Sequence, residues 1–152
     1  SHRPFLVEQA EAMNVPSGPL RAELVAGKPI TLPDGSVINP DDVLGPARRG
    51  ARLVHIGDCG SIKGLQKAAL EADALVIEAT YLSSESDLAK KFGHLSAGQA
   101  AEFAQRIGVR HLYLTHISRR YREKEVVEEA RAIFPNTTVA RDFDHFQIKR
   151  AE

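Results

Sequence analysis

The sequence lacks several features that would place a protein in a specialised class. Its single cysteine, Cys59, has no second cysteine to pair with, so nothing indicates an oxidising compartment. No apolar run is long enough to cross a membrane. Lysine and arginine total 20, as do aspartate and glutamate, so the bulk charge neither favours nor excludes a nucleic-acid partner. We therefore expect a cytoplasmic protein without membrane binding, in which contact with nucleic acid depends on a local basic patch.

The first third of the chain is distinguished by its prolines. Seven of the eight prolines precede residue 50, and prolines in such numbers do not run through a central sheet. We expect short helices over 5–13 and 20–26, then a β-hairpin over 30–38 with Asp34 and Gly35 in the turn. This segment is predicted to be an appendage or a protruding arm.

After residue 50, short apolar runs alternate with helical patterns. The predicted strands are 52–57, 74–79, 111–115 and two near 137–140 and 144–148. The predicted helices lie near 61–71, near 85–91, after the capping box of Ser96 and Gln99, and near 121–134. This alternation predicts an α/β fold with a parallel sheet.

Three of the predicted strands end in side chains that bind metals or handle protons. LVHIGD (53–58) ends in Asp58, ALVIE (74–78) in Glu78, and HLYLTH (111–116) in His116. The carboxyl ends of parallel strands meet at one edge of a sheet, where ligands bind. A carboxylate can bridge two cations and an imidazole can bind one of them, which is the arrangement of a metallohydrolase that cleaves phosphodiesters.

Each of these residues also has a structural interpretation. Asp58 can cap the next helix, His116 can be a buried, hydrogen-bonded core histidine, and Glu78 can be a surface acid at a strand end. As functional residues, Asp58 and His116 would bind metal, and Glu78 would orient a catalytic histidine. The joint pattern favours the functional interpretation.

Two further segments carry candidate residues. His94 lies just before a helix amino terminus, where it can contact a phosphate or protonate a departing oxygen, or have no role. In THISRRYR (115–122), Arg120 is suited to phosphate contact, whereas Arg119 and Arg122 are better explained as a solvated helix start. The chain contains no HxH or HxHxDH segment, so Asp58 and His116 form half of a dinuclear site.

In combination, several motifs give the chain a family resemblance. They are GD (57–58), EAT (78–80), GHxS followed by QAA (93–101), THISxRY (115–121) and FPN with A.DF (134–143). With the proline-rich segment 15–38, they resemble the carboxyl-terminal half of the ribonuclease Z family, the tRNA 3′-processing endoribonucleases of the metallo-β-lactamase superfamily. Cys59, Ile77 and Leu95 depart from the family pattern.

The resemblance implies a domain organisation. The first two residues, serine and histidine without an initiator methionine, themselves indicate a tag remnant over 1–2. By the resemblance, residues 3–44 would be an arm that grips tRNA away from the cleavage site. Residues 45–152 would be the carboxyl-terminal half of an αββα sandwich. The chain would then be a piece of a longer protein.

The resemblance also implies a role for each site residue. Asp58 would bridge two zinc ions, His116 would be a terminal zinc ligand, and His94, supported by Glu78, would act at the scissile phosphate. Substrate contacts would come from residues near His116 and in the arm: Ser118, Arg120, Tyr121, Arg21 and Lys28.

The implied activity is cleavage of the 3′ trailer from precursor tRNA by attack of a metal-activated water on a phosphodiester. Two zinc ions are expected in the full-length parent, a homodimer, whereas this fragment alone is expected to be inactive and to bind zinc weakly or not at all. The alternatives are another metallo-β-lactamase-type phosphodiesterase or hydrolase, and a non-catalytic half that binds RNA or another partner.

Overall fold

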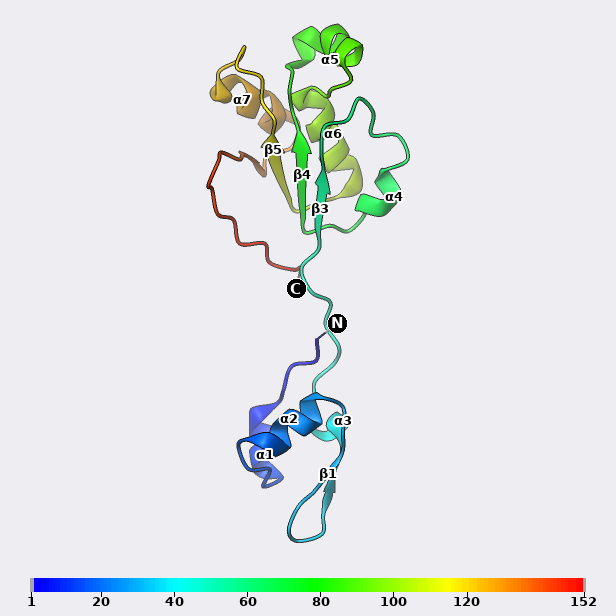
Figure 1. Cartoon of the computed structure of the whole chain (residues 1–152), viewed down its shortest axis with the longest axis vertical. Coiled ribbons are helices and arrows are strands. Elements are labelled where there is room, and N and C mark those ends of the chain that lie inside the picture. The colour runs from blue at the N-terminus through cyan, green and yellow to red at the C-terminus, as the bar shows by residue number, and fades with distance from the viewer. Residues whose placement is uncertain (1, 152) are drawn as a thin grey trace. The chain divides into compact units, whose positions relative to one another are not determined.

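The computed structural model describes residues 2–151, which divide between Gly50 and Ala51 into two compact units, each with its own apolar core (Figure 1). Ser1, half of the predicted tag remnant, and Glu152 lie outside the described residues. His2 forms an antiparallel bridge with Arg48 and therefore belongs to the smaller unit.

The smaller unit consists of three short helices and a hairpin. Its elements are α1 (Val7–Ala12), α2 (Pro19–Val25), β1 (Ile30–Thr31), β2 (Val37–Ile38) and α3 (Pro40–Val43). Two of the prolines begin α2 and α3, where a missing N–H costs nothing and the fixed φ suits a helix. Both predicted helices and the hairpin are confirmed.

The larger unit contains a four-stranded parallel sheet. Its strands are β3 (Leu53–Ile56), β4 (Ala74–Glu78), β5 (His111–Thr115) and β6 (Thr137–Val139), in the order β3-β4-β5-β6. In the register of β4 and β5, Glu78 lies opposite Thr115. Because the strands are parallel, their carboxyl ends share one edge, which confirms the predicted α/β fold.

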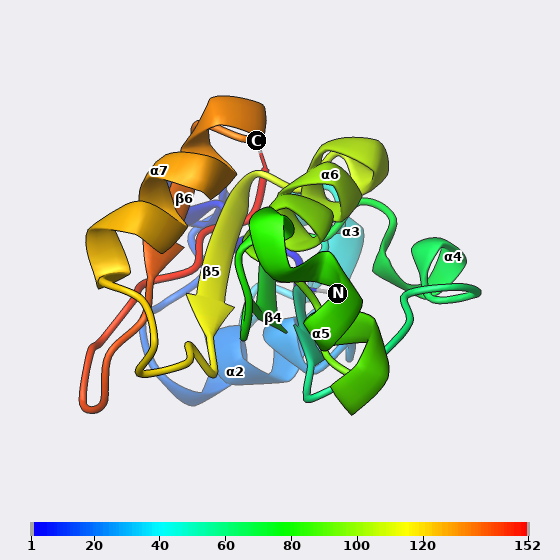
Figure 2. The ribbon, with the colours of Figure 1, turned by 90° about the horizontal axis from the view of Figure 1, so that it is seen from above.

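Two amphipathic helices cover the sheet. Helices α6 (Ala97–Ile107) and α7 (Glu123–Ile133) lie side by side, with α6 against β4 and β5 and α7 against β6 (Figure 2). Leu75 and Ile77 of β4 pack with Phe103 of α6 in a core where each is 0–1% exposed. The predicted capping box begins α6: Ser96 Oγ accepts from Gln99 N–H at 3.2 Å, and Gln99 Oε1 accepts from Ser96 N–H at 2.9 Å.

Shorter elements complete the larger unit. They are α4 (Gln66–Ala69), the 3₁₀ turn η1 (Ser83–Glu85) and α5 (Ser86–Phe92). The predicted helix over 61–71 is wrong in extent, because Gly64 adopts a φ of 80° that a helix cannot contain.

The predicted strand over 144–148 is absent, although all five residues are described. Phe143 has a φ of 68°, which breaks the extended backbone before this segment. Within this segment the Phe146 ring lies 4.4 Å from that of Tyr113 in β5, and beyond it Ala151 N–H donates a hydrogen bond to the Asp73 carboxylate at 2.8 Å. These two contacts, and not strand pairing, therefore hold the carboxyl-terminal residues to the larger unit.

Within residues 2–151, none of the helices has the length and apolar character needed to cross a bilayer.

Candidate active site

The structure brings together the side chains that follow the strand ends. Asp58 follows β3 after one glycine, and His116 directly follows β5; Asp58 Oδ2 lies 3.3 Å from His116 Nε2. His94, from the turn between α5 and α6, stacks its ring on that of His116 with centroids 5.2 Å apart. One ligand atom from each of Asp58, His94 and His116 lies within 4.8 Å of the others.

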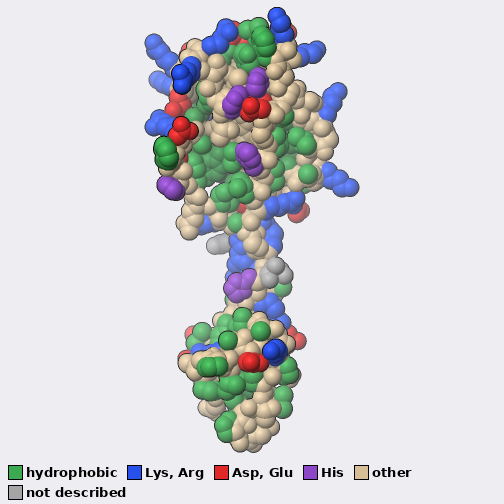
Figure 3. Space-filling model, viewed as in Figure 1, with side chains coloured by type: hydrophobic (Ala, Val, Ile, Leu, Met, Phe, Trp, Pro, Cys, Tyr) green, Lys and Arg blue, Asp and Glu red, His purple; other side chains and the backbone are tan. Residues whose placement is uncertain are grey.

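This cluster is open to solvent. The side chains of Asp58 and His116 are 56% and 48% exposed, and that of His94 is 22% exposed. Figure 3 shows histidine and acidic side chains side by side on the face of the larger unit. A carboxylate with imidazole nitrogens is a donor set that suits zinc and related divalent cations. The cluster therefore fits part of a metal site, as the sequence predicts.

The structural interpretations of the three strand-end residues are wrong. Asp58 caps no helix, because the N-cap of the next helix, α4, is Leu65. His116 is half exposed rather than buried in the core. Glu78 is fully buried rather than at the surface.

The backbone at His116 has a conformation that few side chains adopt. Its φ is 53°, in the left-handed region that costs a non-glycine residue about 1 kcal/mol or more. In this conformation the imidazole Nε2 lies 3.3 Å from Asp58 Oδ2. Such local strain persists when surrounding contacts hold it, and it is concentrated at functional sites.

Glu78 connects the segments that form the cluster. Its Oε1 accepts from Cys59 N–H at 2.6 Å, beside Asp58. Its Oε2 accepts from the Thr80 hydroxyl at 2.5 Å, from Leu95 N–H at 3.2 Å and from His94 Nδ1 at 3.0 Å. We refer to Glu78 and these four partners as the Glu78 network.

The network keeps the Glu78 carboxylate ionised. Burial raises its pKa, but the hydrogen bonds from the Thr80 hydroxyl, the Cys59 and Leu95 amides and the His94 ring outweigh burial, so the pKa lies below its ordinary value of 4.5. An ionised carboxylate only accepts hydrogen bonds. His94 must therefore donate through Nδ1, which leaves Nε2 as the nitrogen available to a ligand.

The residues that depart from the family pattern contribute mainly to packing. Ile77 and Leu95 are 0% and 1% exposed and belong to the core. At position 95 the backbone amide, which any residue but proline supplies, carries the contact with Glu78. Burial, and then the nearby Glu78 charge, raise the pKa of the Cys59 thiol and so disfavour its thiolate form.

Two glycines allow the Asp58 loop to approach the turn that carries His94. A Cβ built at Gly60 would lie 2.8 Å from Gly93 Cα and 3.1 Å from its carbonyl carbon. Gly93, with a φ of 72°, ends α5 in the left-handed conformation. The close backbone contact brings Asp58 and His94 to the same cluster.

Gly60→Ala is accordingly expected to lower the free energy of unfolding by about 2 kcal/mol, within the range for overpacking against backbone that cannot yield. The matched control is Gly57→Ala, because a Cβ at Gly57 meets nothing within 4 Å and its φ is not positive. Urea unfolding measures both variants. Equal stabilities for the two variants would show that the approach of residues 60 and 93 is not tight.

Glu85 holds two of the three predicted substrate-binding residues after His116, Arg120 and Tyr121. Arg120 Nη2 lies 2.6 Å from Glu85 Oε1, and the Tyr121 hydroxyl donates to the other carboxylate oxygen. Ser118 N–H donates to the Thr80 carbonyl at 3.3 Å. The sequence did not indicate the contact with Glu85, which a phosphate on Arg120 would have to displace or share.

A groove of about 420 Å³ borders His116. Ser118, Tyr121 and Arg119 line it together with Arg141, which forms two 2.8 Å hydrogen bonds with Glu123. Arg120 is not among its lining residues. The groove therefore offers room directly beside the cluster, and its lining combines two arginines with two acids, Glu123 and Asp142.

The two predicted contacts in the smaller unit differ in their surroundings. Arg21 is 18% exposed, donates to the Val15 carbonyl through Nη2 at 3.0 Å and lies over the Phe5 ring. Lys28 is 68% exposed, with its ammonium 3.8 Å from Glu23. Arg21 thus stabilises the unit itself, whereas Lys28 extends into solvent. A contact of either with tRNA stays a prediction.

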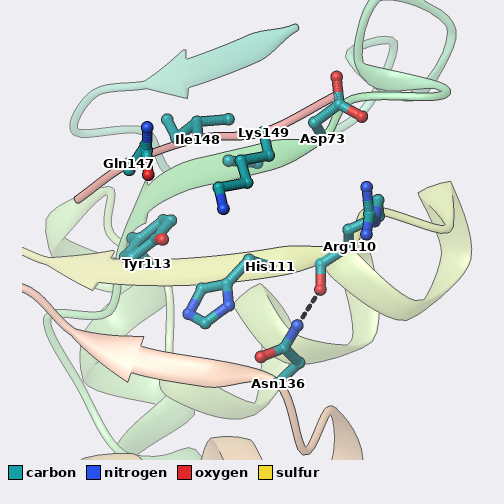
Figure 4. A pocket seen from close by; sticks show the side chains of 9 residues that line it. Asp73, Arg110, His111, Tyr113, Asn136, Gln147, Ile148 and Lys149 are labelled. Atoms are coloured by element: carbon teal, nitrogen blue, oxygen red, sulfur yellow. Dashed lines mark hydrogen bonds between the residues drawn. The ribbon is translucent and has the colours of Figure 1, made fainter. Parts of the chain in front are cut away.

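A second hollow lies at the opposite edge of the sheet, where the strands begin (Figure 4). It has a volume of about 180 Å³ and is lined by residues that include His111 and Gln147, Ile148 and Lys149 of the carboxyl-terminal segment. Burial, and then the Arg131 charge, lower the pKa of His111. The length of β5 separates this hollow from the cluster at the carboxyl edge.

Comparison with known proteins gives a family match over most of the chain. Residues 12–117 match the model of the beta-lactamase superfamily domain. Among solved structures, human tRNase Z, short form, is 31% identical with a TM-score of 0.53, over 74% of this chain and 36% of that one. The fold is shared with the metallo-beta-lactamase fold protein YhfI from Bacillus subtilis. That protein is 21% identical, with a TM-score of 0.55, and the match covers 59% of this chain and 36% of YhfI.

Curated relatives named Ribonuclease Z are more similar in sequence. The protein from Bradyrhizobium diazoefficiens is 46% identical over 148 residues, which are 97% of this chain and 49% of the relative. The protein from Geobacillus kaustophilus is 40% identical over 150 residues, again 97% of this chain and 49% of the relative. The chain therefore spans about half the length of these relatives.

Proposed function

The chain belongs to the beta-lactamase superfamily, and on that premise we propose that it is the carboxyl-terminal part of a zinc-dependent endoribonuclease that removes the 3′ trailer from precursor tRNA. The observation that carries the proposal is the convergence of Asp58, His94 and His116 at one edge of the sheet. The similarity to proteins named Ribonuclease Z and tRNase Z supports the choice of substrate.

In the proposed site, Asp58 and His116 would hold two zinc ions together with ligands from the rest of the parent protein. When bound, the ions would supply positive charge to the phosphodiester oxygens and lower the pKa of water. His116 would bind through Nε2, the nitrogen that faces Asp58. The 56% exposure of Asp58 leaves its carboxylate accessible to both ions.

His94 is the residue that would act on the substrate. Its Nδ1 N–H is donated to Glu78, so Nε2 is the atom that faces the substrate, and in the doubly protonated ring it would donate a hydrogen bond to the scissile phosphate or a proton to the departing 3′-oxygen. Stacking on His116 at 5.2 Å keeps the ring beside the metal ligands. Glu78 would orient this histidine without touching the substrate, because it is fully buried.

The remaining contacts would position the RNA. Ser118 and Tyr121 line the groove beside His116, and Arg120 lies on the same segment, where it would exchange Glu85 for a phosphate. In the smaller unit, the proposed arm, Lys28 has the exposure that a contact with the tRNA backbone requires. The proposed parent acts in the cytoplasm as a homodimer, and light scattering of the parent tests the assembly.

The experiment is cleavage of a precursor tRNA by the full-length parent before and after removal of metal with a chelator. We expect cleavage at the 3′ end of the acceptor stem, its loss on chelation and its return with zinc. The 152-residue chain alone is expected to leave the RNA intact and to bind zinc weakly. Tight binding of two zinc ions with turnover by this chain would overturn that part of the proposal.

Deletion of residues 4–44 from the parent tests the choice of substrate. We expect precursor tRNA processing to fall while cleavage of a small phosphodiester is retained. Normal tRNA processing by the deletion variant would favour a hydrolase that acts on other phosphodiesters. Binding of tRNA by the chain without any cleavage by the parent, unaffected by Asp58→Ala, would favour a non-catalytic RNA-binding role.

A further inference from the structure

We propose that Thr80 is a positioning residue that fixes the proton of the His116 ring on Nδ1, so that Nε2 presents its lone pair beside Asp58. The inference rests on the proposed role of His116 as a metal ligand. Metal-binding histidines generally donate their other ring N–H to an acceptor that sets the tautomer and the orientation of the ring. In this chain the acceptor is a hydroxyl whose own direction is set by Glu78.

The first step is the direction of the hydrogen bond between Glu78 and Thr80. Glu78 Oε1 and Oε2 each accept from a backbone amide, that of Cys59 and that of Leu95 respectively, and an amide can only donate. A carboxylate in such surroundings is ionised and carries no proton to give. Thr80 Oγ1, 2.5 Å from Glu78 Oε2, must therefore donate its hydrogen to the carboxylate.

The second step is the direction of the contact between Thr80 and His116. A hydroxyl has one hydrogen, and that of Thr80 is already donated to Glu78, so Oγ1 can only accept from other groups. His116 Nδ1 lies 2.9 Å from this oxygen. An unprotonated Nδ1 would place two lone pairs against each other at this short distance. Nε2 also faces an acceptor, Asp58 Oδ2, but at the longer distance of 3.3 Å and in an exposed contact, so we assign the proton to Nδ1. In the neutral ring, the lone pair is then on Nε2.

The position of Thr80 is set by backbone contacts as well as by Glu78. Ala79 N–H donates to the Thr115 carbonyl at 2.9 Å, and Ser118 N–H donates to the Thr80 carbonyl at 3.3 Å. These bonds flank His116 on both sides in the sequence. The hydroxyl is thus held against the ring by the β4 and β5 strand ends, and Thr80 is only 8% exposed.

The same carboxylate sets both histidines of the cluster. His94 Nδ1 donates directly to Glu78 Oε2 at 3.0 Å, and His116 Nδ1 donates to it through Thr80. Both Nε2 atoms are thereby left for the open side of the cluster. One buried charge can in this way align two rings that arise from different loops.

The tautomer is measured directly by ¹⁵N NMR of the 152-residue chain at a pH of about 9, where histidine rings are ordinarily neutral. The unprotonated nitrogen resonates far downfield of the protonated one, and the couplings to the protons on the ring carbons show which nitrogen is Nδ1 and which is Nε2. In the unsubstituted chain we expect Nε2 of His116 to be the downfield nitrogen. A downfield Nδ1 would overturn the inference without any variant.

Thr80→Val keeps the shape of the side chain but removes the hydroxyl. Asp58 then becomes the acceptor left beside His116, so we expect the proton to move to Nε2 and the downfield nitrogen to become Nδ1. Thr80→Ser should restore the original pattern. The matched control is Thr138→Val, because Thr138 Oγ1 lies 2.9 Å from His111 Nε2 in a pair outside the cluster; it should leave the His116 spectrum unchanged.

Zinc affinity of the full-length parent gives a second readout. Thr80→Val is expected to weaken zinc binding by about 10- to 100-fold, the usual effect of losing a partner of a metal-binding histidine, and Thr80→Ser to stay close to the unsubstituted protein. Weaker binding with an unchanged tautomer would overturn the inference and assign Thr80 a purely structural role. A changed tautomer in a parent that cleaves no tRNA would instead sustain the inference and refute the proposed function.

Discussion

Replacing Glu78 with glutamine is expected to lower the free energy of unfolding of the chain by about 3 kcal/mol. The carboxylate is fully buried and accepts from the amides of Cys59 and Leu95, the Thr80 hydroxyl and the His94 ring. Glutamine has the same shape but turns an amino group toward N–H donors, and each buried donor without an acceptor costs about 1–3 kcal/mol. Urea unfolding followed by circular dichroism measures the loss.

Glu128→Gln is the matched control for this substitution. Glu128 lies on α7 with a side chain 63% exposed, and its contact with Lys124 is a surface ion pair. Its replacement is expected to change the free energy of unfolding by no more than about 0.5 kcal/mol. Similar losses for Glu78→Gln and Glu128→Gln would contradict the structural role of the Glu78 network.

The stability that Glu78 contributes also depends on pH. Burial raises its folded-state pKa, but the hydrogen bonds of the network together lower it by more. The pKa therefore lies below the ordinary value of 4.5. A carboxyl group with a lowered pKa stabilises the fold fully above its unfolded-state pKa and loses that contribution as the pH falls through the folded-state pKa. The stability difference between the unsubstituted chain and Glu78→Gln should therefore be constant near neutrality and shrink on acidification below about pH 4.5. A difference that grows on acidification would be the opposite result.

In the full-length parent, Asp58→Asn is expected to reduce precursor tRNA cleavage by about 1000-fold or more. An amide lacks the negative charge with which a carboxylate bridges two cations. A loss of several kcal/mol in the stabilisation of the transition state corresponds to such a factor, since each 1.36 kcal/mol of activation free energy changes the rate about tenfold. The measurements are the cleavage rate and the zinc content of the purified variant, both of which should fall.

The stability of Asp58→Asn separates loss of function from loss of fold. The Asp58 side chain is 56% exposed, so the free energy of unfolding of the 152-residue chain should change by no more than about 0.5 kcal/mol. Asp87→Asn, in the first turn of α5 and away from the cluster, should leave both cleavage and zinc content unchanged. Full cleavage by Asp58→Asn would refute the proposed metal site.

The larger part of the fold follows from local sequence patterns. Apolar runs predict β3, β4 and β5 nearly to the residue, and the Ser96 capping box predicts the start of α6. The comparisons confirm the predicted metallo-β-lactamase fold. The predicted strand over 144–148 is an error where a tertiary contact overrides local preference, because Phe146 packs onto Tyr113 and no strand forms there.

The cluster was predictable because strand order was not needed to find it. Asp58 and His116 follow parallel strands, and parallel strands end at one edge whichever pair is adjacent. Thr80 gave no comparable signal, because its contacts require the register that places Glu78 opposite Thr115. The burial of Glu78 and the ion pair between Arg120 and Glu85 likewise depend on contacts between segments that are distant in the sequence.

The Glu78 network has a consequence for the thermodynamics of ligand exchange. All of the groups that hold the Asp58 loop, the His94 turn and the segment after β4 belong to the polypeptide, so the conformational entropy of these loops is lost during folding. A cation or phosphate that arrives later need not order them again. If the site works as proposed, a smaller part of the interaction energy would then be offset by loop ordering, and product release would not depend on a rearrangement of these loops.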